Sequence, residues 1–220
     1  MTTDGTWLGQ TRREEVANSV THGVGAVLGV LGVGYLLVRG LASSDGWNIF
    51  GFAVYLSTFI ALYASSSVYH AVKQVAPKQV LRHVDRSAVF VFIAGCYTPF
   101  LLGPMRGQVG TAALLFVWGI AALGVALELS LKSRFVVAST ALYLGMGWFG
   151  VLGLPVALHL LGAQGLGWVL AGGVFYTVGV GFFWWSTLPF HHAIWHLFVL
   201  AGSACHFHVV AHYLLPTATG

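Results

Sequence analysis

Long apolar runs, separated by short polar or turn-forming segments, dominate the chain. The runs predict seven membrane-spanning helices, because each approaches or exceeds the roughly 20 apolar residues that a helix needs to cross a bilayer. The predicted spans are Val16–Val38, Trp47–Val72, Ser87–Leu102, Val109–Leu129, Phe135–Leu161, Leu166–Trp185 and Ala193–Leu215.

The connections between these spans are short. They read ASSDG, KQVAPKQVLRHVD, GPMRGQ, SLKSR, GAQG and LPFHH, and each contains turn-forming or charged residues. Since none could fold by itself, the sequence predicts a single domain, residues 1–220.

Composition also indicates a membrane protein, because 57% of the residues are hydrophobic and 7% are charged, against roughly a quarter charged in a soluble domain. We therefore expect an all-α membrane protein, a seven-transmembrane helix bundle.

The distribution of Lys and Arg predicts the orientation of this bundle. Cytoplasmic loops carry an excess of these residues. Counting on a seven-span chain places Arg12, Arg13, Lys73, Lys78, Arg82, Arg86, Lys132 and Arg134 on one side, and Arg39 and Arg106 on the other. The N-terminus is therefore predicted to be cytoplasmic and the C-terminus outside. The net charge of +4 is scattered over the loops, so it indicates membrane topology and no nucleic-acid partner.

Ionisable and polar side chains gather near four predicted helix ends on the cytoplasmic side. They are Glu15, Asn18, Thr21 and His22 in the first span, Ser66 and His70 at the end of the second, Asp85 at the start of the third, and His192 and His196 at the start of the seventh. Residues four apart lie on one face of a helix, so Ser66 pairs with His70 and His192 with His196. Such groups are expensive in a membrane and usually mark a functional site.

A divalent metal is the function that this set of residues indicates best. Neutral imidazole nitrogens are zinc ligands, and a helical His-x3-His pair offers two of them on one face. His70, His192 and His196 would leave one tetrahedral position open, as catalytic zinc sites do. Asp85 suits the task of orienting water in that position and taking its proton, and the Ser66 hydroxyl could donate to a substrate carbonyl.

The other polar residues of the spans have simpler interpretations. His206, His208 and His212 lie in the outer half of the last span, where we expect them to pack, bond the backbone or face the interface. His83 and His191 adjoin loops and are expected to face solvent or to lie behind the ligands. Glu128 lies four residues before Lys132, a spacing that predicts a surface ion pair. The two cysteines, Cys96 and Cys205, lie in apolar runs and are expected to pack in the core.

Four short motifs resemble those of a known family. The segments EVANSVTH from Glu15, SSVYH ending at His70, DRS from Asp85 and HAIWH from His192 are similar, in order and content, to motifs of the progestin and adipoQ receptor family. The likeness is strongest to its bacterial branch, the hemolysin III proteins, and it covers nearly the whole chain.

The resemblance implies a fold and a chemistry. It implies a seven-helix bundle with a cytoplasmic N-terminus in a bacterial plasma membrane, and zinc held by His70, His192 and His196. It further implies that Asp85 holds the zinc-bound water, that Ser66 has a polar role, and that Glu15, Asn18 and His22 support the site. Related adiponectin receptors are associated with ceramide hydrolysis, and a wider superfamily of membrane hydrolases shares the Ser, Asp and three-His constellation. The receptors' long soluble N-terminal segment has no counterpart in this sequence, which argues against a hormone receptor.

Several functions remain open at this stage. The first is a zinc-dependent hydrolase that cleaves an amide or ester of a membrane lipid. The second is a non-enzymatic protein in which zinc ties helices together. The third is a lytic or pore-forming protein, as the family name suggests, and a proton or ion path through the histidines near both faces is the fourth. The sequence indicates neither the lipid nor the oligomeric state.

Overall fold

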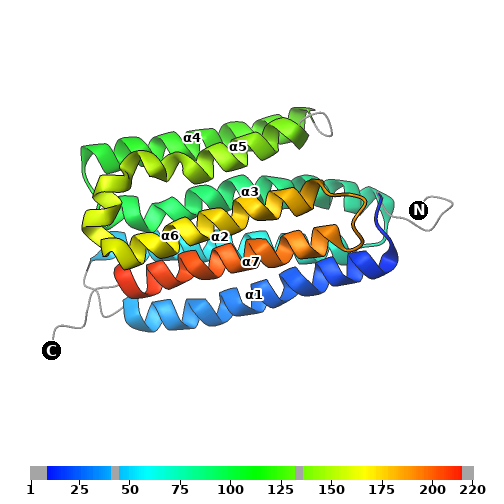
Figure 1. The fold of residues 1–220 in the computed structure, drawn as a ribbon, viewed down its shortest axis with the longest axis horizontal. Helices are drawn as coiled ribbons and strands as arrows, with labels where there is room; N and C mark the ends of the chain where they lie inside the picture. Colours follow the sequence, from blue (N-terminus) through cyan, green and yellow to red (C-terminus); the bar gives the residue numbers. More distant parts are fainter. Residues whose placement is uncertain (1–8, 41–44, 132–135, 215–220) are drawn as a thin grey trace.

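The protein is a bundle of helices that run roughly parallel or antiparallel to one another (Figure 1). The computed structural model describes residues 9–40, 45–131 and 136–214. Their helices are α1 (Arg12–Gly40), α2 (Gly46–Ala71), α3 (Val75–Leu102), α4 (Gln108–Leu131), α5 (Val136–Trp148), the 3-10 helix η2 (Phe149–Gly153), α6 (Leu154–Trp184), α7 (His191–Val209) and the π-helical turn η3 (Val210–Leu214). The predicted ends Phe135 and Leu215, and the cations Lys132 and Arg134, lie outside these described residues.

Six helical stretches of the described residues are long and apolar enough to cross a membrane. The prediction was seven, and the difference arises because α5, η2 and α6 form one stretch of 49 residues, Val136–Trp184. A straight helix of that length would span about 74 Å, more than twice the hydrocarbon thickness. Figure 1 shows α5 and α6 lying in separate rows, so the stretch is not one straight rod. Within α6, Gly162 has non-helical angles (φ 64°, ψ 177°), a conformation that glycine adopts without strain.

The predicted long loop before the third span is wrong. Residues 75–85 are helical, because α3 begins at Val75 and only three residues, 72–74, separate it from α2. Pro77 falls in the first turn of α3, where a proline is tolerated because the amide groups there have no helical partner. The earlier start turns Lys78 and Asp85 from loop residues into residues of a helix face.

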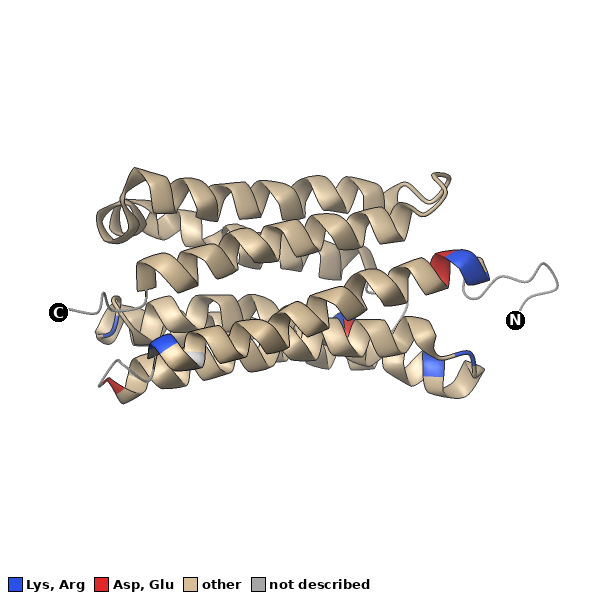
Figure 2. Ribbon diagram, turned by 90° about the horizontal axis from the view of Figure 1, so that it is seen from below, with Lys and Arg blue, Asp and Glu red and all other residues tan. Residues whose placement is uncertain are grey.

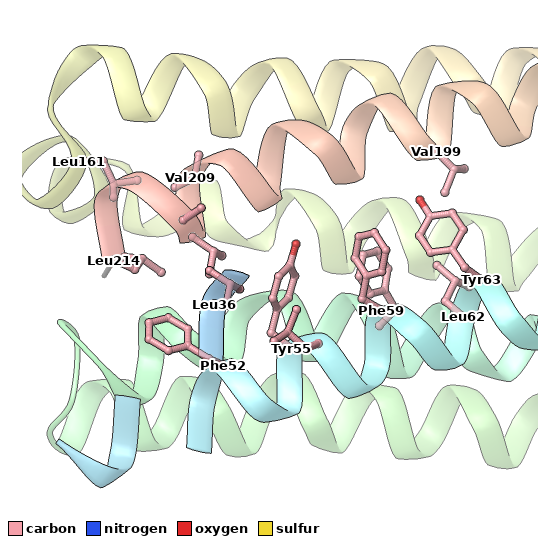
Figure 3. Packing of buried hydrophobic residues seen from close by; sticks show 14 residues of the cluster. Leu36, Phe52, Tyr55, Phe59, Leu62, Tyr63, Leu161, Val199, Val209 and Leu214 are labelled. Atoms are coloured by element: carbon pink, nitrogen blue, oxygen red, sulfur yellow. The ribbon is translucent and has the colours of Figure 1, made fainter. Parts of the chain in front are cut away.

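An aromatic row on α2 forms the centre of the larger core cluster. Phe52, Tyr55, Phe59 and Tyr63 recur every three or four residues and are each at most 5% exposed, so one face of α2 is buried. Figure 3 shows these rings rising from α2 toward α7. The Tyr63 hydroxyl donates to Ser203 Oγ on α7 at 2.8 Å, which fixes the two helices at the middle of the bundle.

Two glycines allow α1 to approach this aromatic row closely. A Cβ atom at Gly25 would overlap the ring of Tyr63, and one at Gly29 would lie 2.8 Å from Phe59. The Gly25-x3-Gly29 spacing, which is typical of close helix contacts in membranes, therefore serves packing between α1 and α2 of the same chain.

Charged residues are rare along the length of the helices. Figure 2 shows Lys, Arg, Asp and Glu mainly toward the two ends of the bundle. Large apolar side chains such as Val27, Leu31 and Leu115 are 62%, 65% and 69% exposed, respectively. Exposed apolar surface of this kind is unfavourable in water but stable against lipid tails.

Candidate metal centre

Helix ends bring the predicted site residues to one end of the bundle. His70 lies in the last turn of α2, and His192 and His196 lie in the first turns of α7. Phe190 precedes α7 in the left-handed conformation (φ 58°), and its amide donates to Glu14 Oε1 on α1 at 3.0 Å. This contact joins the starts of α1 and α7 and thereby places the two α7 imidazoles next to α1.

His70, His192 and His196 form a compact cluster that could hold a metal ion. Each offers one ring nitrogen, and these three atoms lie within 4.8 Å of one another. The ring centroids are 5.1 Å apart for His70 and His192, and 4.6 Å apart for His192 and His196. The Nε2 atoms of all three rings are buried and have no hydrogen-bond partner. Three converging nitrogens without partners fit a metal that prefers imidazole ligands.

The second nitrogen of two of these rings is held by a neighbour on α1. His70 Nδ1 lies 2.7 Å from Glu15 Oε2. His196 Nδ1 lies 3.1 Å from Thr21 Oγ1 and 3.2 Å from the Asn18 carbonyl oxygen. A partner that accepts the Nδ1 proton fixes the tautomer in which Nε2 carries the lone pair, and it also fixes the ring orientation. Helix α1 thus supports ligands from α2 and α7.

Asp85 and Ser66 lie beside the cluster. The Asp85 carboxyl group on α3 is near enough to His70 and to the Ser66 hydroxyl to interact electrostatically with both. Ser66 is 1% exposed and lies one helical turn before His70 on α2. The arrangement brings a carboxylate and a hydroxyl from two helices to the side of the three imidazoles.

His22 and Asn18 line the cluster from α1. The His22 ring stacks on His196, with centroids 3.5 Å apart and an interplanar angle of 15°, and neither His22 nitrogen has a hydrogen-bond partner. The Asn18 amide nitrogen lies 3.5 Å from His70 Nδ1 and also donates to Gln10. The structure therefore brings together all nine polar residues that the sequence placed near four helix ends.

Sequence reasoning missed one residue of this region, Lys78. Its ammonium group lies 3.1 Å from Glu15 Oε2, and its side chain is 2% exposed. The prediction had placed Lys78 in a loop. Pro77, which suits the first turn of a helix, was the available signal that α3 begins early enough to turn this lysine inward.

A second buried charge cluster corrects the interpretation of Glu128. This residue is 0% exposed, and it lies 2.9 Å from His83 Nδ1 and 3.0 Å from Arg86 Nη2 on α3. Arg86 also donates to Ser139 on α5 at 2.8 Å. The predicted surface position of Glu128 is wrong, because α4 turns this residue toward α3; the predicted partner Lys132 lies outside the described residues. His83 belongs to this cluster, and its side chain remains 25% exposed.

The histidines of the other end behave as the sequence predicts. His206 Nε2 lies 3.3 Å from the Val169 carbonyl oxygen, and His212 Nδ1 lies 3.0 Å from the His208 carbonyl oxygen. The His208 ring packs on Trp168 at 4.7 Å. Cys96 and Cys205 are free thiols, half-buried and buried respectively.

A bundle of long apolar helices, with its charged residues mainly toward the two ends (Figure 2), defines a multi-pass integral membrane protein. Comparison with known proteins identifies the family of membrane proteins to which the chain belongs. Residues 10–207 match the family model described as Haemolysin-III related, and the chain belongs to this family, the hemolysin III branch of the progestin and adipoQ receptor family.

Three relatives illustrate the match. The chain is 38% identical to Hemolysin-3 of Bacillus cereus over 219 residues, which is 100% of both chains. It is 38% identical to the Hemolysin-3 homolog of Bacillus subtilis over 203 residues, covering 92% of this chain and 95% of the relative. It is also 32% identical to the human monocyte to macrophage differentiation factor, covering 94% of this chain and 87% of that protein.

Proposed function

We propose that this protein is a zinc-dependent hydrolase that cleaves an amide or ester bond of a membrane lipid. The observation that carries the proposal is the cluster of His70, His192 and His196, in which one ring nitrogen of each lies within 4.8 Å of the others and each Nε2 atom is buried without a hydrogen-bond partner. A carboxylate and a hydroxyl group lie beside this cluster. Three protein ligands leave one tetrahedral position for water or substrate, which distinguishes catalytic from structural zinc sites.

The donor set favours zinc over harder cations. All three ligands are neutral imidazoles, whereas magnesium and calcium prefer oxygen ligands. When bound, zinc would act as a Lewis acid, lowering the pKa of water to about 7 and polarising a carbonyl group. These properties suit the attack of water on an acyl carbon at neutral pH.

The protein's own residues have distinct tasks in this proposal. Asp85 accepts the proton that the attacking water loses, and later delivers it to the leaving amine or alcohol. The Ser66 hydroxyl donates to the carbonyl oxygen as negative charge develops on it. Glu15 and Thr21 hold two imidazoles in the orientation that binding requires.

A lipid is the substrate class that fits the position of the site. The cluster lies where α2 ends and α7 begins, so it sits near the end of the apolar bundle. The amide and ester bonds of lipids lie at the same kind of boundary, between acyl chains and head groups.

We further propose that the chain crosses the membrane seven times with its N-terminus in the cytoplasm. Separation of α5 from α6 in the bundle (Figure 1) supports counting them as two passes. The excess of Lys and Arg near the start of α1 and the α2–α3 turn supports the orientation. The candidate metal centre then lies on the cytoplasmic side.

The experiment that tests the hydrolase combines metal analysis with a lipid panel. Purified wild-type protein is expected to carry stoichiometric zinc and to release fatty acid from at least one ceramide or glycerolipid. Asp85→Asn should keep the metal but lose about 10²–10⁴-fold in rate, the range for general acid–base groups. Asp45→Asn, at the other end of the bundle, is the matched control and should retain the rate. Zinc-loaded wild-type protein without activity on a broad panel would contradict the proposal.

A structural metal is the second candidate, since the ligands come from α2 and α7 and a bound ion would join these helices. On this alternative Asp85→Asn has the zinc content and melting temperature of the wild type, whereas His196→Ala melts at a lower temperature.

The names of the Bacillus relatives suggest lysis as a third candidate. Dye release from liposomes by purified protein, unaffected by a chelator, would favour it.

A further inference from the structure

Lys78 is buried, unlike Lys73, the other lysine within the described residues. Its residue exposure is 2%, while Lys73, five residues earlier, is exposed. Burying an ammonium group is costly unless the group is paired and hydrogen-bonded.

The ammonium group has three donors, and each has an acceptor. It donates to the carbonyl oxygens of Tyr69 at 3.0 Å and Val72 at 3.3 Å. These belong to the end of α2, where carbonyl groups have no helical partner and the helix dipole favours a cation. The third contact is Glu15 Oε2 at 3.1 Å. Two contacts thus fix Lys78 to α2, and the third directs its charge at a side chain of α1.

The Glu15 oxygen that Lys78 contacts is also the oxygen that meets a candidate ligand. Glu15 Oε2 lies 2.7 Å from His70 Nδ1, and the Nε2 atom of the same ring is the one without a partner in the cluster. Lys78, Glu15 and His70 therefore form a continuous chain from the start of α3 to the candidate metal centre. The Glu15 side chain is 8% exposed, so Lys78 supplies the countercharge that this buried carboxylate requires.

We propose that Lys78 is a positioning residue of the metal centre. It holds the Glu15 carboxylate where that group accepts the Nδ1 proton of His70, so that His70 presents Nε2 to the metal. This inference rests on the metal-binding part of the proposed function and does not depend on hydrolysis. Mutation of a carboxylate that holds a ligating histidine typically lowers metal affinity 10–100-fold. Lys78 does not contact His70 in the proposed role and acts on it only through Glu15.

The first test measures zinc affinity by competition with a chromophoric chelator in detergent. Lys78→Met retains the length of the side chain and removes its charge, and it should raise the Kd for Zn²⁺ by about 10-fold, the lower end of that range. Lys73→Met removes a charge from an exposed site nearby and should leave the Kd unchanged. Lys78→Arg, which retains a cation, should recover most of the affinity. An unchanged Kd in Lys78→Met would overturn the inference.

The second test asks whether Lys78 acts through Glu15. Glu15→Gln and the double variant Glu15→Gln/Lys78→Met should have the same Kd within about twofold, because residues acting in series are not additive. Additive losses in the double variant would overturn the proposed chain. Cobalt-substituted protein gives an independent readout, since Lys78→Met should alter the visible absorption of bound Co²⁺ if the orientation of His70 changes, and an unaltered spectrum counts against the inference.

Folding and function are separable in this design. If Lys78→Met does not yield folded protein, Lys78→Gln retains donors to the α2 carbonyl groups without the charge, and the same increase in Kd is expected. A variant that melts earlier yet binds Zn²⁺ as wild type does would show that Lys78 only joins α2 to α3. Wild-type protein that binds no Zn²⁺ would overturn the metal centre itself, whereas tight binding without lipid hydrolysis would overturn only the enzymatic proposal.

Discussion

Two of the three candidate ligands, His70 and His196, use their two ring nitrogens differently. In His70 and His196 one nitrogen meets a residue of α1 and the other, Nε2, is buried without a partner. An unsatisfied buried polar atom costs about 1–3 kcal/mol. A shared metal ion would offset that cost for three rings at once, which is the physical reason to interpret the cluster as a binding site.

At this scale we predict that His196→Ala abolishes stoichiometric zinc. The variant removes one of three ligands, and two imidazoles from α2 and α7 bind a divalent ion far more weakly. His206→Ala is the matched control, because it removes a half-buried histidine of the same helix whose ring nitrogen contacts the Val169 carbonyl oxygen, away from the cluster. Elemental analysis of the three proteins, checked for folding by gel filtration, gives the answer. Equal zinc in wild type and His196→Ala would exclude this cluster as the binding site.

The sequence predicted which residues form the candidate metal centre better than it predicted which of them contact one another. Helical spacing alone puts His192 and His196 on one face. It cannot reveal that Glu15 meets His70, or that Thr21 meets His196, because those contacts depend on how α1 is rotated against α2 and α7. Lys78 was missed for the same reason, since its direction depends on where α3 begins.

At the scale of elements, the Glu128 cluster joins helices that otherwise share mainly apolar contacts. Glu128 on α4 meets His83 and Arg86 on α3, and Arg86 meets Ser139 on α5. Tyr143 on α5 also donates to the Arg86 carbonyl oxygen at 2.8 Å. Polar contacts of this kind fix the rotation and depth of α4 and α5, because apolar surfaces in lipid do not select one register.

We predict that Glu128→Leu lowers the free energy of unfolding by about 3 kcal/mol, because it leaves the Arg86 guanidinium, on a side chain only 15% exposed, without its carboxylate. The double variant Arg86→Met/Glu128→Leu removes both charges and should recover much of the loss, since replacing a whole buried pair by apolar groups is often neutral. Unfolding of each purified variant in detergent, monitored by circular dichroism, measures its free energy of unfolding. If the single variant unfolds as wild type does, the cluster does not stabilise the bundle.

At the scale of the whole molecule, the bundle has two polar ends of different charge. The starts of α1 and α3 and the turn before α3 carry Arg12, Arg13, Lys73 and Lys78, whereas Arg39 and Arg106 are on the other side of the proposed seven-span arrangement. Arg106 is moreover paired with Asp45 at 3.0 Å, which lowers the net positive charge of that end. This asymmetry is the basis of the proposed orientation.

The corresponding prediction concerns labelling of single cysteines from either side of the membrane. Gln79→Cys, in the first turns of α3, should react with an impermeant thiol reagent only in inverted vesicles. Gln108→Cys, at the start of α4, should react in intact cells. Both positions are exposed, and the background variant Cys96→Ala/Cys205→Ala removes the natural thiols. The opposite pattern, or labelling of both from one side, would overturn the proposed topology.

The sequence by itself determined that the chain is helical, apolar and embedded in a membrane, because composition and the length of apolar runs reflect the solvent around each helix. It also indicated which side chains are too polar for lipid. Only the tertiary structure decided which of them meet, such as Glu128 with Arg86 and Lys78 with Glu15. The reason is that helical periodicity determines the relative positions of side chains on one helix, whereas contacts between helices depend on their rotation and depth, which packing of the whole bundle selects.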